Sequence, residues 1–311
     1  MSKVAIVQGT DPKLITRQAL DLVEAKKIVR HKECVLVKPN CVFPKDPSTG
    51  VTTDPRVVEA IVELLRDNGV QDVVIGDGGD HNTDKIFDMI GMRDVAARYG
   101  AKLVNFNHDE GVDVEIPSAM ALHKVAIAKT ILDSSFIINV PKLKIHHMAQ
   151  VTLSIKNLMG IIVGDRSSIM HRQIDKKLVD LASYVKPGLN VIDGIVGCEM
   201  DEVKGEPVSM NLVIAGTDIV ATDAVGAAVM GLDPKMVRHL QLAEKRGLGT
   251  ARLDAISIVG ESIESVRKDF RTCFSKEKLR QYGFDYYVGD EVLRPIFENG
   301  GSKLPKTQRQ D

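Results

Sequence analysis

Short apolar segments rich in β-branched residues alternate with amphipathic segments of helical spacing along most of this 311-residue chain. Such alternation favours a parallel sheet with helices on both faces, because parallel strands need a crossover that a helix usually supplies. Strands are expected at 3–7, 33–38, 102–106, 134–140, 189–192, 210–215 and 253–259, and the segment DVVIGDGG at 72–79 is expected to form a further strand and its turn.

Helical spacing predicts the elements between these strands, at 12–28, 55–68, 83–99, 148–162, 174–185, 217–231 and 234–246. The helix at 55–68 has a recognisable start, because Asp54 suits the N-cap and Pro55 the first helical position. Residues 112–133 contain two short strand candidates. We predict one α/β domain over residues 1–298, with a mostly parallel sheet, mixed strands in the middle segment and a flexible tail at 299–311.

The composition argues against several classes of partner. Charged residues make up 27% of the chain and nearly cancel, leaving a net charge of −1, whereas proteins that bind nucleic acid usually carry a basic excess. No apolar stretch is long enough to span a bilayer, and the apolar run in MSKVAIVQGT is too short for a secretory signal. We expect a cytoplasmic protein without nucleic-acid or membrane partners, and a homodimer because two-fold dimers are the commonest oligomers.

Polar residues follow several of the predicted strands directly. Ligands of open parallel sheets bind beyond the carboxyl ends of the strands, so these positions are candidates for substrate binding. They are Lys38 and Asn40 after 33–38, Asp77 after the strand of DVVIGDGG, Lys142, Lys144, His146 and His147 after 134–140, Asp193 after 189–192, and Asp218 after 210–215. The GDGGD segment lacks the spacing of known phosphate-binding loops, and we interpret it as a tight turn.

The stretch KLKIHHMAQVTLSIKNLMG at 142–160 places several cations among apolar residues. On a helix from 148 to 160, Lys156 and Asn157 would border a cleft while the opposite face packs. A buried lysine needs a carboxylate or an anionic ligand. Two interpretations stay open: Lys156 pairs with Asp77 or Asp193, or it joins other lysines in an anion site, namely Lys38 and Lys144.

The adjacent histidines are candidates for proton transfer. In a regular element His146 and His147 cannot both point at one ion, so we expect one of them to act as a ligand or as a general acid or base. Asp193 and Asp218 would orient that base or hold a divalent metal ion. His171 and Asp223 are further candidates for such a site, which no HxH or HExxH spacing supports.

Taken in order, several motifs make the chain resemble the family known as domain of unknown function 362. They are KPN at 38–40, TTDP at 52–55, GDG at 76–78, NVPKLKIHH at 139–147, TLSIKNLMG at 152–160, NVIDGIVG at 190–197 and TDIVATDAVGAAVMGLDP at 217–234. The resemblance covers residues 33–260. It implies a cytoplasmic α/β domain, and many relatives are described as iron–sulfur proteins that carry an additional ferredoxin-like module.

The cysteine run CxxCxxCxxxC of that module is absent from this sequence. Cys41 and Cys198 follow motifs at the ligand side of the predicted sheet, so an iron–sulfur cluster or metal held by these two cysteines is one hypothesis. Cys34 is expected to face the core, and Cys273 lies outside the region of resemblance.

Three hypotheses for function follow. The first is an enzyme that binds a small carboxylate or phosphate, with His146, His147 and Lys156 as its catalytic residues. Its substrate-binding residues would be Lys38, Asn40, Asp77, Lys142, Lys144 and Asn157. The second is an iron–sulfur or other metal-binding redox protein, with metal ligands among Asp193, Asp218, Cys41 and Cys198. The third is a binding protein without catalytic activity.

Overall fold

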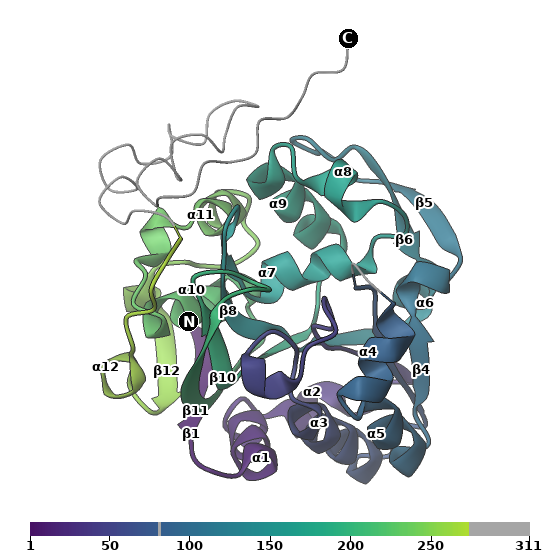
Figure 1. Ribbon diagram of the computed structural model, residues 1–311, viewed down its shortest axis with the longest axis horizontal. Coiled ribbons are helices and arrows are strands. Elements are labelled where there is room, and N and C mark those ends of the chain that lie inside the picture. The colour runs from purple at the N-terminus through teal and green to yellow at the C-terminus, as the bar shows by residue number, and fades with distance from the viewer. Residues whose placement is uncertain (80–81, 274–311) are drawn as a thin grey trace.

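A mixed β-sheet runs through the middle of the protein, with helices on both of its faces (Figure 1). The computed structural model describes residues 1–79 and 82–273. In these residues ten strands form the sheet. They are β1 (Ser2–Gln8), β2 (Cys34–Lys38), β3 (Asp72–Asp77), β4 (Lys102–Asn105), β7 (Phe136–Asn139), β8 (Lys142–His146), β9 (Gln150–Thr152), β10 (Leu189–Glu199), β11 (Glu206–Gly216) and β12 (Ile256–Gly260).

The strand order is β12-β1-β11-β10-β7-β2-β3-β4, and β8 and β9 form a hairpin attached to β10. Along this path every neighbouring pair is parallel except the two pairs that contain β11. The prediction of a mostly parallel α/β sheet is therefore confirmed. Because β11 alone on this path runs the other way, its carboxyl end lies at the sheet edge where its neighbours begin.

Helices pack on both faces because the strands bury alternate residues on opposite sides. In β2, Val35 and Val37 join the apolar core under α1, α3 and α5, while Leu36 joins the core under α7, α9, α10 and α11. Figure 1 shows these two groups of helices on either side of the sheet. The helices are α1 (Pro12–Leu22), α2 (Ala25–Val29), α3 (Pro55–Asp67), α4 (Thr83–Met89), α5 (Met92–Tyr99), α6 (Lys129–Asp133), α7 (Ser154–Asn157), α8 (Arg166–Met170), α9 (Ile174–Tyr184), α10 (Ile219–Val229), α11 (Arg238–Lys245) and α12 (Ile263–Val266).

The start of α3 follows the predicted capping pattern. The Asp54 side chain accepts a hydrogen bond from the backbone N–H of Arg56, and Pro55 occupies the first helical position. Two other predicted helices are each interrupted. The segment 12–28 divides into α1 and α2 at Glu24, which has a φ of 57°, and 83–99 divides into α4 and α5 at Gly91, which has a φ of 77°.

The prediction of a helix at 148–162 is wrong for residues 148–153. Lys142 to His146 form β8, and residues 150–152 return beside it as β9, with Ile145 opposite Val151. Gln150 takes a left-handed φ of 67°, which ends any helix there. The helix begins only at Ser154 with α7 and continues as a 3₁₀ turn over Leu158–Ile161.

The middle segment forms a small sheet of its own. Strands β5 (Gly111–Glu115) and β6 (Lys124–Ala128) pair antiparallel, as the two strand candidates at 112–133 suggested. No helix within residues 1–79 and 82–273 has both the length and the apolar character needed to cross a bilayer. The predicted tail at 299–311 lies outside the described residues.

Strands β10 and β11 are both longer than predicted and form one long antiparallel hairpin. Between the pairs Gly194–Leu212 and Val196–Ser209, β11 contains one residue more than β10, which makes a β-bulge. Asn211 lies in this bulge with a φ of 52°, and asparagine tolerates that conformation better than most residues. The loop at the hairpin tip, residues 200–205, reaches beyond the carboxyl ends of the parallel strands.

A buried ion pair ties this hairpin to the rest of the sheet. Lys142 of β8 lies 2.7 Å from Asp193 of β10, and both side chains have no exposed surface. Asp193 also accepts hydrogen bonds from the backbone N–H groups of Asp54 and Ile195. Burial raises the pKa of Asp193 although the Lys142 charge opposes the shift.

We expect Lys142→Met to destabilise the protein by about 3–5 kcal/mol, because it leaves a buried carboxylate without its cation. The double variant Lys142→Met with Asp193→Asn should lose less, since no net charge then remains in the sheet. Urea unfolding of both variants measures the difference. Lys186→Met, at an exposed lysine, should stay within about 0.5 kcal/mol of the unchanged protein. Equal losses in the single and double variants would show that the two side chains are not coupled.

Candidate functional site

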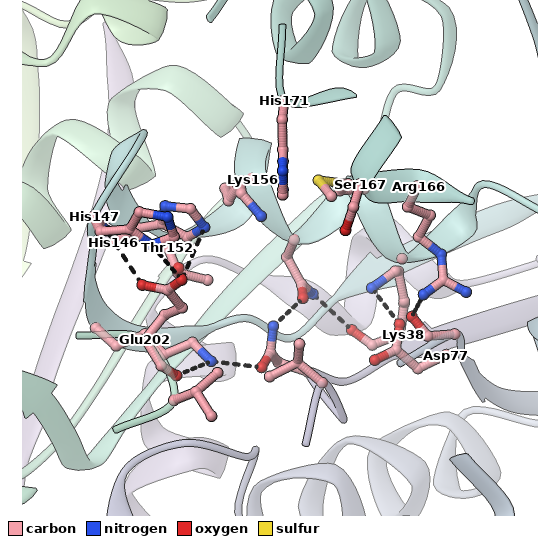
Figure 2. Close-up of a pocket in the computed structure, with 18 residues that line it drawn as sticks. Lys38, Asp77, His146, His147, Thr152, Lys156, Arg166, Ser167, His171 and Glu202 are labelled. Atoms are coloured by element: carbon pink, nitrogen blue, oxygen red, sulfur yellow. Dashed lines mark hydrogen bonds and ion pairs between the residues drawn. The ribbon is translucent and has the colours of Figure 1, made fainter. Parts of the chain in front are cut away.

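A small pocket lies where the carboxyl ends of β2 and β3 meet the β8–β9 hairpin, α7 and the 200–205 loop (Figure 2). Its cavity volume is about 120 Å³. The residues around it are mostly cationic or polar: Lys38, Asn40, Val42, Asp77, Gly78, Lys144, His146, His147, Thr152, Lys156, Asn157, Met159, Gly160, Arg166, Ser167, His171, Glu202 and Val203. The predicted site residues Lys38, Asn40, Asp77, Lys144, His146, His147, Lys156 and Asn157 therefore come together here.

One end of the pocket is built on a buried ion pair. Lys38 Nζ lies 2.7 Å from Asp77 Oδ1, and the other oxygen of Asp77 accepts the backbone N–H of Cys41. A methyl group on Gly160 would lie 2.4 Å from Asp77 Oδ1 and 2.9 Å from Lys38 Nζ. Glycine at 160 is thus required because the backbone passes directly over this pair.

An arginine holds the two glycines that follow β3. The Arg166 guanidinium donates to the carbonyl oxygens of Gly78 and Gly79, at 2.7 and 2.8 Å, and to that of Ile162. A side chain on Gly79 would come within 2.3 Å of the Cys41 carbonyl oxygen. The glycines therefore allow close packing of backbone on backbone. The GDGGD segment reaches Asp80, which lies outside the described residues, so its interpretation as a tight turn stays a prediction.

A chain of amide side chains forms the floor. Lys144 Nζ donates to Asn40 Oδ1, Asn40 donates to Asn157 Oδ1, and Asn157 donates to the Asn139 side chain. The amide orientations are assigned from this network. Because each amide both accepts and donates, the chain fixes Asn40 and Asn157 in single orientations under the cavity.

Lys144 is fully buried and has oxygen partners on three sides. Besides Asn40 it donates to the carbonyl oxygens of Val51 and Glu202, at 2.8 and 3.1 Å. Burial lowers the pKa of Lys144 to about 8. These three acceptors use all three protons of the ammonium group. The bond to the Glu202 carbonyl oxygen fixes the 200–205 loop next to Lys144.

His146 is locked as a neutral ring. Its Nδ1 accepts hydrogen bonds from the backbone N–H groups of Met148 and Ala149, at 3.0 and 3.1 Å. An accepting Nδ1 carries no proton, so the proton is assigned to Nε2. Burial, reinforced by the nearby Lys156 charge, lowers the pKa of His146 well below its usual value.

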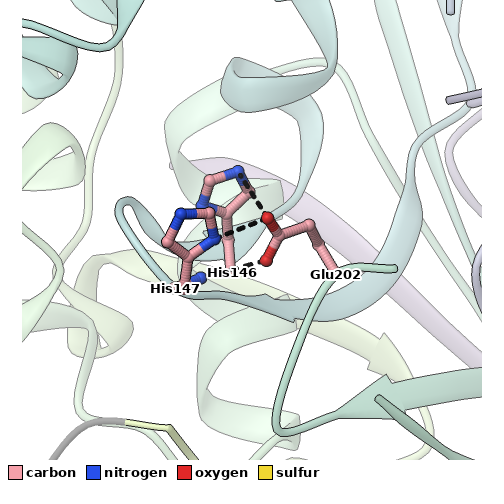
Figure 3. A group of neighbouring side chains, drawn as sticks. All are labelled: His146, His147 and Glu202. Atoms are coloured by element: carbon pink, nitrogen blue, oxygen red, sulfur yellow. Dashed lines mark hydrogen bonds and ion pairs between the residues drawn. The ribbon is translucent and has the colours of Figure 1, made fainter. Parts of the chain in front are cut away.

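His147 forms a histidine–carboxylate pair with Glu202. Its Nδ1 lies 2.5 Å from Glu202 Oε1, and its backbone N–H donates to Oε2 (Figure 3). The ring stacks on His146 with centroids 5.0 Å apart. Burial alone would raise the pKa of Glu202, but the His147 hydrogen bond and the two histidines outweigh it and hold this pKa well below the usual range.

The two histidines thus behave differently from our expectation. We predicted that adjacent histidines within a regular element cannot both point at one ion. Here β8 ends at His146 and the chain turns, so that condition is not met and both rings approach Glu202. Glu202 takes the orienting role that we had assigned to Asp193 and Asp218.

Helix α7 presents Lys156 to the pocket and is itself fixed from behind. Asp223 of α10 accepts the backbone N–H groups of Ser154 and Ile155, at 2.7 and 2.9 Å. Figure 2 shows Lys156 and His171 pointing into the pocket from the same side. Neither interpretation of Lys156 as a partner of Asp77 or Asp193 holds, because those carboxylates pair with Lys38 and Lys142.

Three of the predicted lysine and aspartate site residues, Lys142, Asp193 and Asp218, lie away from the pocket wall. Lys142 and Asp193 are used in the buried pair within the sheet. Asp218 caps α10 and accepts a hydrogen bond from the hydroxyl group of Ser2. Our expectation assumed that every strand ends on the same side, and Asp218 follows the antiparallel strand β11, so it lies at the opposite edge.

Cys41 and Cys198 do not converge with other metal-ligating side chains at a cluster site in the described part of the chain. Both are buried, and burial raises the pKa of Cys41 well above its usual value and that of Cys198 to about 11. The Cys198 thiol donates to the carbonyl oxygen of Asp201. Within residues 1–79 and 82–273, the three side chains that converge closely enough to share a metal ion are His146, His147 and Glu202, with ligand atoms within 4.8 Å.

That group does not suit a metal ion either. A histidine that binds a metal through Nε2 normally carries its proton on Nδ1 and donates it to a neighbour. His146 has the reverse arrangement, with two N–H groups directed at Nδ1. The proton on Nε2 instead makes this ring a hydrogen-bond donor toward the pocket.

Sequence reasoning missed several pocket residues as site residues. Thr152 was placed on a predicted helix, and Glu202 and Arg166 follow no predicted strand. The acidic stretch MDEVKG at 200–205 was a usable signal for Glu202, because it joins two strong strand patterns and so had to be a loop. No sequence pattern identified Thr152.

Comparison with known proteins identifies the family. Residues 35–228 match the family described as domain of unknown function (DUF362), and the chain belongs to it, as the motifs suggested over a slightly longer range. It is 26% identical over 241 residues to the thylakoid-associated protein sll1697 of Synechocystis sp., covering 71% of this chain and 70% of that protein.

Among solved structures, one similar chain is the lactate racemase apoprotein from Thermoanaerobacterium thermosaccharolyticum. The TM-score is 0.40 at 12% sequence identity, over 72% of this chain and 57% of that chain. A likeness this distant carries no argument about the site.

The Asp223 carboxyl group gives the site a measurable pH dependence. Burial raises its pKa to about 6, although the N–H groups of Ile155 and Ser154 oppose the shift. The folded state therefore binds a proton more tightly than the unfolded chain, and the stability this provides is lost as pH rises from about 3.8 to 6. Asp223→Asn lacks this titration, so its stability relative to the unchanged protein should improve by about 1 kcal/mol between pH 5 and 7.5.

Urea unfolding at the two pH values measures this change. Asp233→Asn, at a surface carboxyl group that caps a 3₁₀ turn, should show no comparable difference between the two pH values. The assignment of a raised pKa to Asp223 fails if the two variants respond alike.

Proposed function

We propose that the protein is an enzyme that binds a small organic anion and transfers a proton to or from it. The observation that carries this proposal is the His147–Glu202 pair at the wall of a small cavity lined by lysines. The size and charge of the cavity support the proposed class of substrate, and the histidine–carboxylate pair supports the proposed class of reaction.

The size of the cavity limits the ligand. An engineered cavity of about 150 Å³ in another protein holds one benzene molecule. The cavity here, at about 120 Å³, is slightly smaller. It suits a ligand of about six non-hydrogen atoms by the same comparison, such as phosphate or a carboxylate of three or four carbons.

The charge of the described lining favours an anion. Four cationic side chains, Lys38, Lys144, Lys156 and Arg166, face two carboxylates, Asp77 and Glu202. Lys38 and Asp77 are almost completely buried, and charges act strongly on a ligand in such a site because little water screens them. The amide floor under the cavity adds fixed dipoles beside these charges.

The histidine–carboxylate pair supports proton transfer. Because Glu202 remains ionised and binds Nδ1 of His147, it fixes the ring, and we assign Nε2 as the nitrogen that exchanges a proton with a ligand. The imidazolium formed on proton uptake would be stabilised by the same carboxylate. His146, whose ring is held neutral, donates from Nε2 instead of taking up a proton.

We also propose that the protein acts in the cytoplasm. All four cysteines lie in the described part of the chain and are free thiols, as is usual in a reducing compartment. The thylakoid association belongs to the name of the relative, and fractionation of cells that express the tagged protein would test the location of this one.

We expect phosphate or a short carboxylate such as propionate to bind the pocket and raise the melting temperature, whereas the uncharged propionamide should not. A ligand at 100 times its Kd stabilises a protein by about 2.7 kcal/mol. Lys156→Met should weaken anion binding about tenfold or more, because it removes a charge at the cavity. Isothermal titration calorimetry and thermal unfolding measure both effects.

The control is Lys186→Met, which removes an exposed lysine and should leave binding unchanged. The proposal is wrong if none of these anions binds. A Lys156→Met variant that unfolds far more easily while its remaining folded fraction binds normally would support a structural role. His147→Gln should keep anion binding and lose turnover, whereas a non-catalytic binding protein would have no turnover to lose.

A further inference from the structure

Two residues of the β8–β9 hairpin that line the pocket carry neutral hydrogen-bond donors. In this antiparallel pair Lys144 lies opposite Thr152, and His146 lies opposite Gln150. Opposite residues project to the same face, and so do residues two apart on one strand. His146 and Thr152 are therefore diagonal neighbours, and both line the cavity (Figure 2).

The first donor is the Nε2–H group of His146. Its direction is fixed, because Met148 and Ala149 hold the ring through Nδ1. Among the described residues, the carboxylate oxygen that approaches Nε2 is Glu202 Oε1, at 3.8 Å, which is too long for a hydrogen bond. This N–H group is thus available to a ligand in the cavity.

The second donor is the Thr152 hydroxyl group. Its side chain is 3% exposed, and Oγ1 has no hydrogen-bond partner among the described residues. A buried hydroxyl without a partner costs about 1–3 kcal/mol, so such groups are normally paired with protein, water or a ligand. The position of Thr152 in the pocket wall makes a ligand oxygen the natural partner.

Neutral donors have a particular use in a pocket already lined by lysines. A cation binds an ionised carboxylate strongly before any reaction occurs, whereas a fixed neutral dipole gains most when charge develops on its partner. A neutral histidine that polarises a carbonyl group is a known solution in other enzymes. The lysines would therefore bind the ionised end of a substrate, and the neutral pair a carbonyl oxygen.

We propose that His146 Nε2–H and the Thr152 hydroxyl together bind the carbonyl oxygen of a short oxo acid, and that the enzyme removes a proton from the carbon beside that carbonyl. This inference rests on the proposed function and specifies its substrate class. Lys156 and Lys38 bind the carboxylate, and His147 is the base.

The step balances without a further reactant. The C–H bond breaks, its proton moves to His147 Nε2, and the electron pair forms a carbon–carbon double bond. The carbonyl π electrons move to the oxygen, which becomes the enolate oxyanion held by the two neutral donors. Return of the proton from the imidazolium to carbon regenerates the ketone and the neutral ring, with no oxidation or reduction.

The test is exchange of carbon-bound hydrogen for deuterium in heavy water, followed by NMR with the full-length protein. Pyruvate and 2-oxobutanoate are the probes, and propionate is the matched acid without the carbonyl group. We expect the protein to accelerate exchange at the carbon next to the carbonyl of the oxo acids and to leave propionate unchanged. His147→Gln should abolish this exchange, and the exposed His123→Gln should not.

Thr152→Val tests the donor pair directly. Loss of one oxyanion donor typically lowers kcat on the order of 100-fold, so we expect slower exchange with nearly unchanged KM. The melting temperature should not fall, because the hydroxyl has no partner in the described chain. Thr152→Ser should restore most of the rate. In the matched control, Thr16→Val, a buried hydroxyl bonded to the Pro12 carbonyl is removed, which should lower stability and leave exchange intact.

The outcomes separate this inference from the proposed function. If the oxo acids bind but no exchange is accelerated, or if Thr152→Val exchanges at the full rate, the donor pair is overturned while anion binding stands. If the oxo acids, propionate and phosphate all fail to bind, the proposed function fails as well. Nitrogen-15 NMR of His146 gives an independent check, since a ring that titrates near pH 6.5 or carries its proton on Nδ1 would also overturn the inference.

Discussion

Three lysine ammonium groups buried in the sheet and its attached hairpin determine how the site is built. Lys38, Lys142 and Lys144 are each at most 1% exposed, and an ammonium group in that position must be surrounded by oxygen atoms. Asp77 and Asp193 supply carboxylates to the first two. Lys144 receives only neutral oxygens, among them the Glu202 backbone carbonyl. The hydrogen bond from Lys144 to this carbonyl oxygen therefore holds the 200–205 loop at the pocket.

This requirement links segments that are distant in sequence. The loop that Lys144 holds carries the Glu202 carboxylate, and that carboxylate fixes His147 on the same hairpin as Lys144. The amide chain that starts at Lys144 runs through Asn40 to Asn157 on α7. One buried cation thus sets the positions of the His147–Glu202 pair, the amide floor and the lysine-bearing helix.

Much of the site that the sequence predicts follows parallel strands, and Lys156 and Asn157 were predicted from the face of a helix. Lys38, Asn40 and Asp77 could be placed together because β2 and β3 end at one edge. The same rule failed for Asp218, since strand direction depends on pairing between distant segments and is not visible in a local pattern. The hairpin at 142–152 was missed for a related reason: its apolar residues fit helical and strand spacing equally well, and pairing with β10 decides between them.

The bulge in the β10–β11 hairpin has a consequence for the pocket. Side chains alternate along a strand with a period of two, so one inserted residue reverses which face every later side chain occupies. In β11 the extra residue falls between Ser209 and Leu212, on the strand that leads away from the 200–205 loop. It therefore sets how the loop side of this strand pairs with β10, and through that pairing the position of the loop that carries Glu202. A single insertion or deletion at the bulge would shift this loop against His147 while every residue of the pocket lining stayed the same.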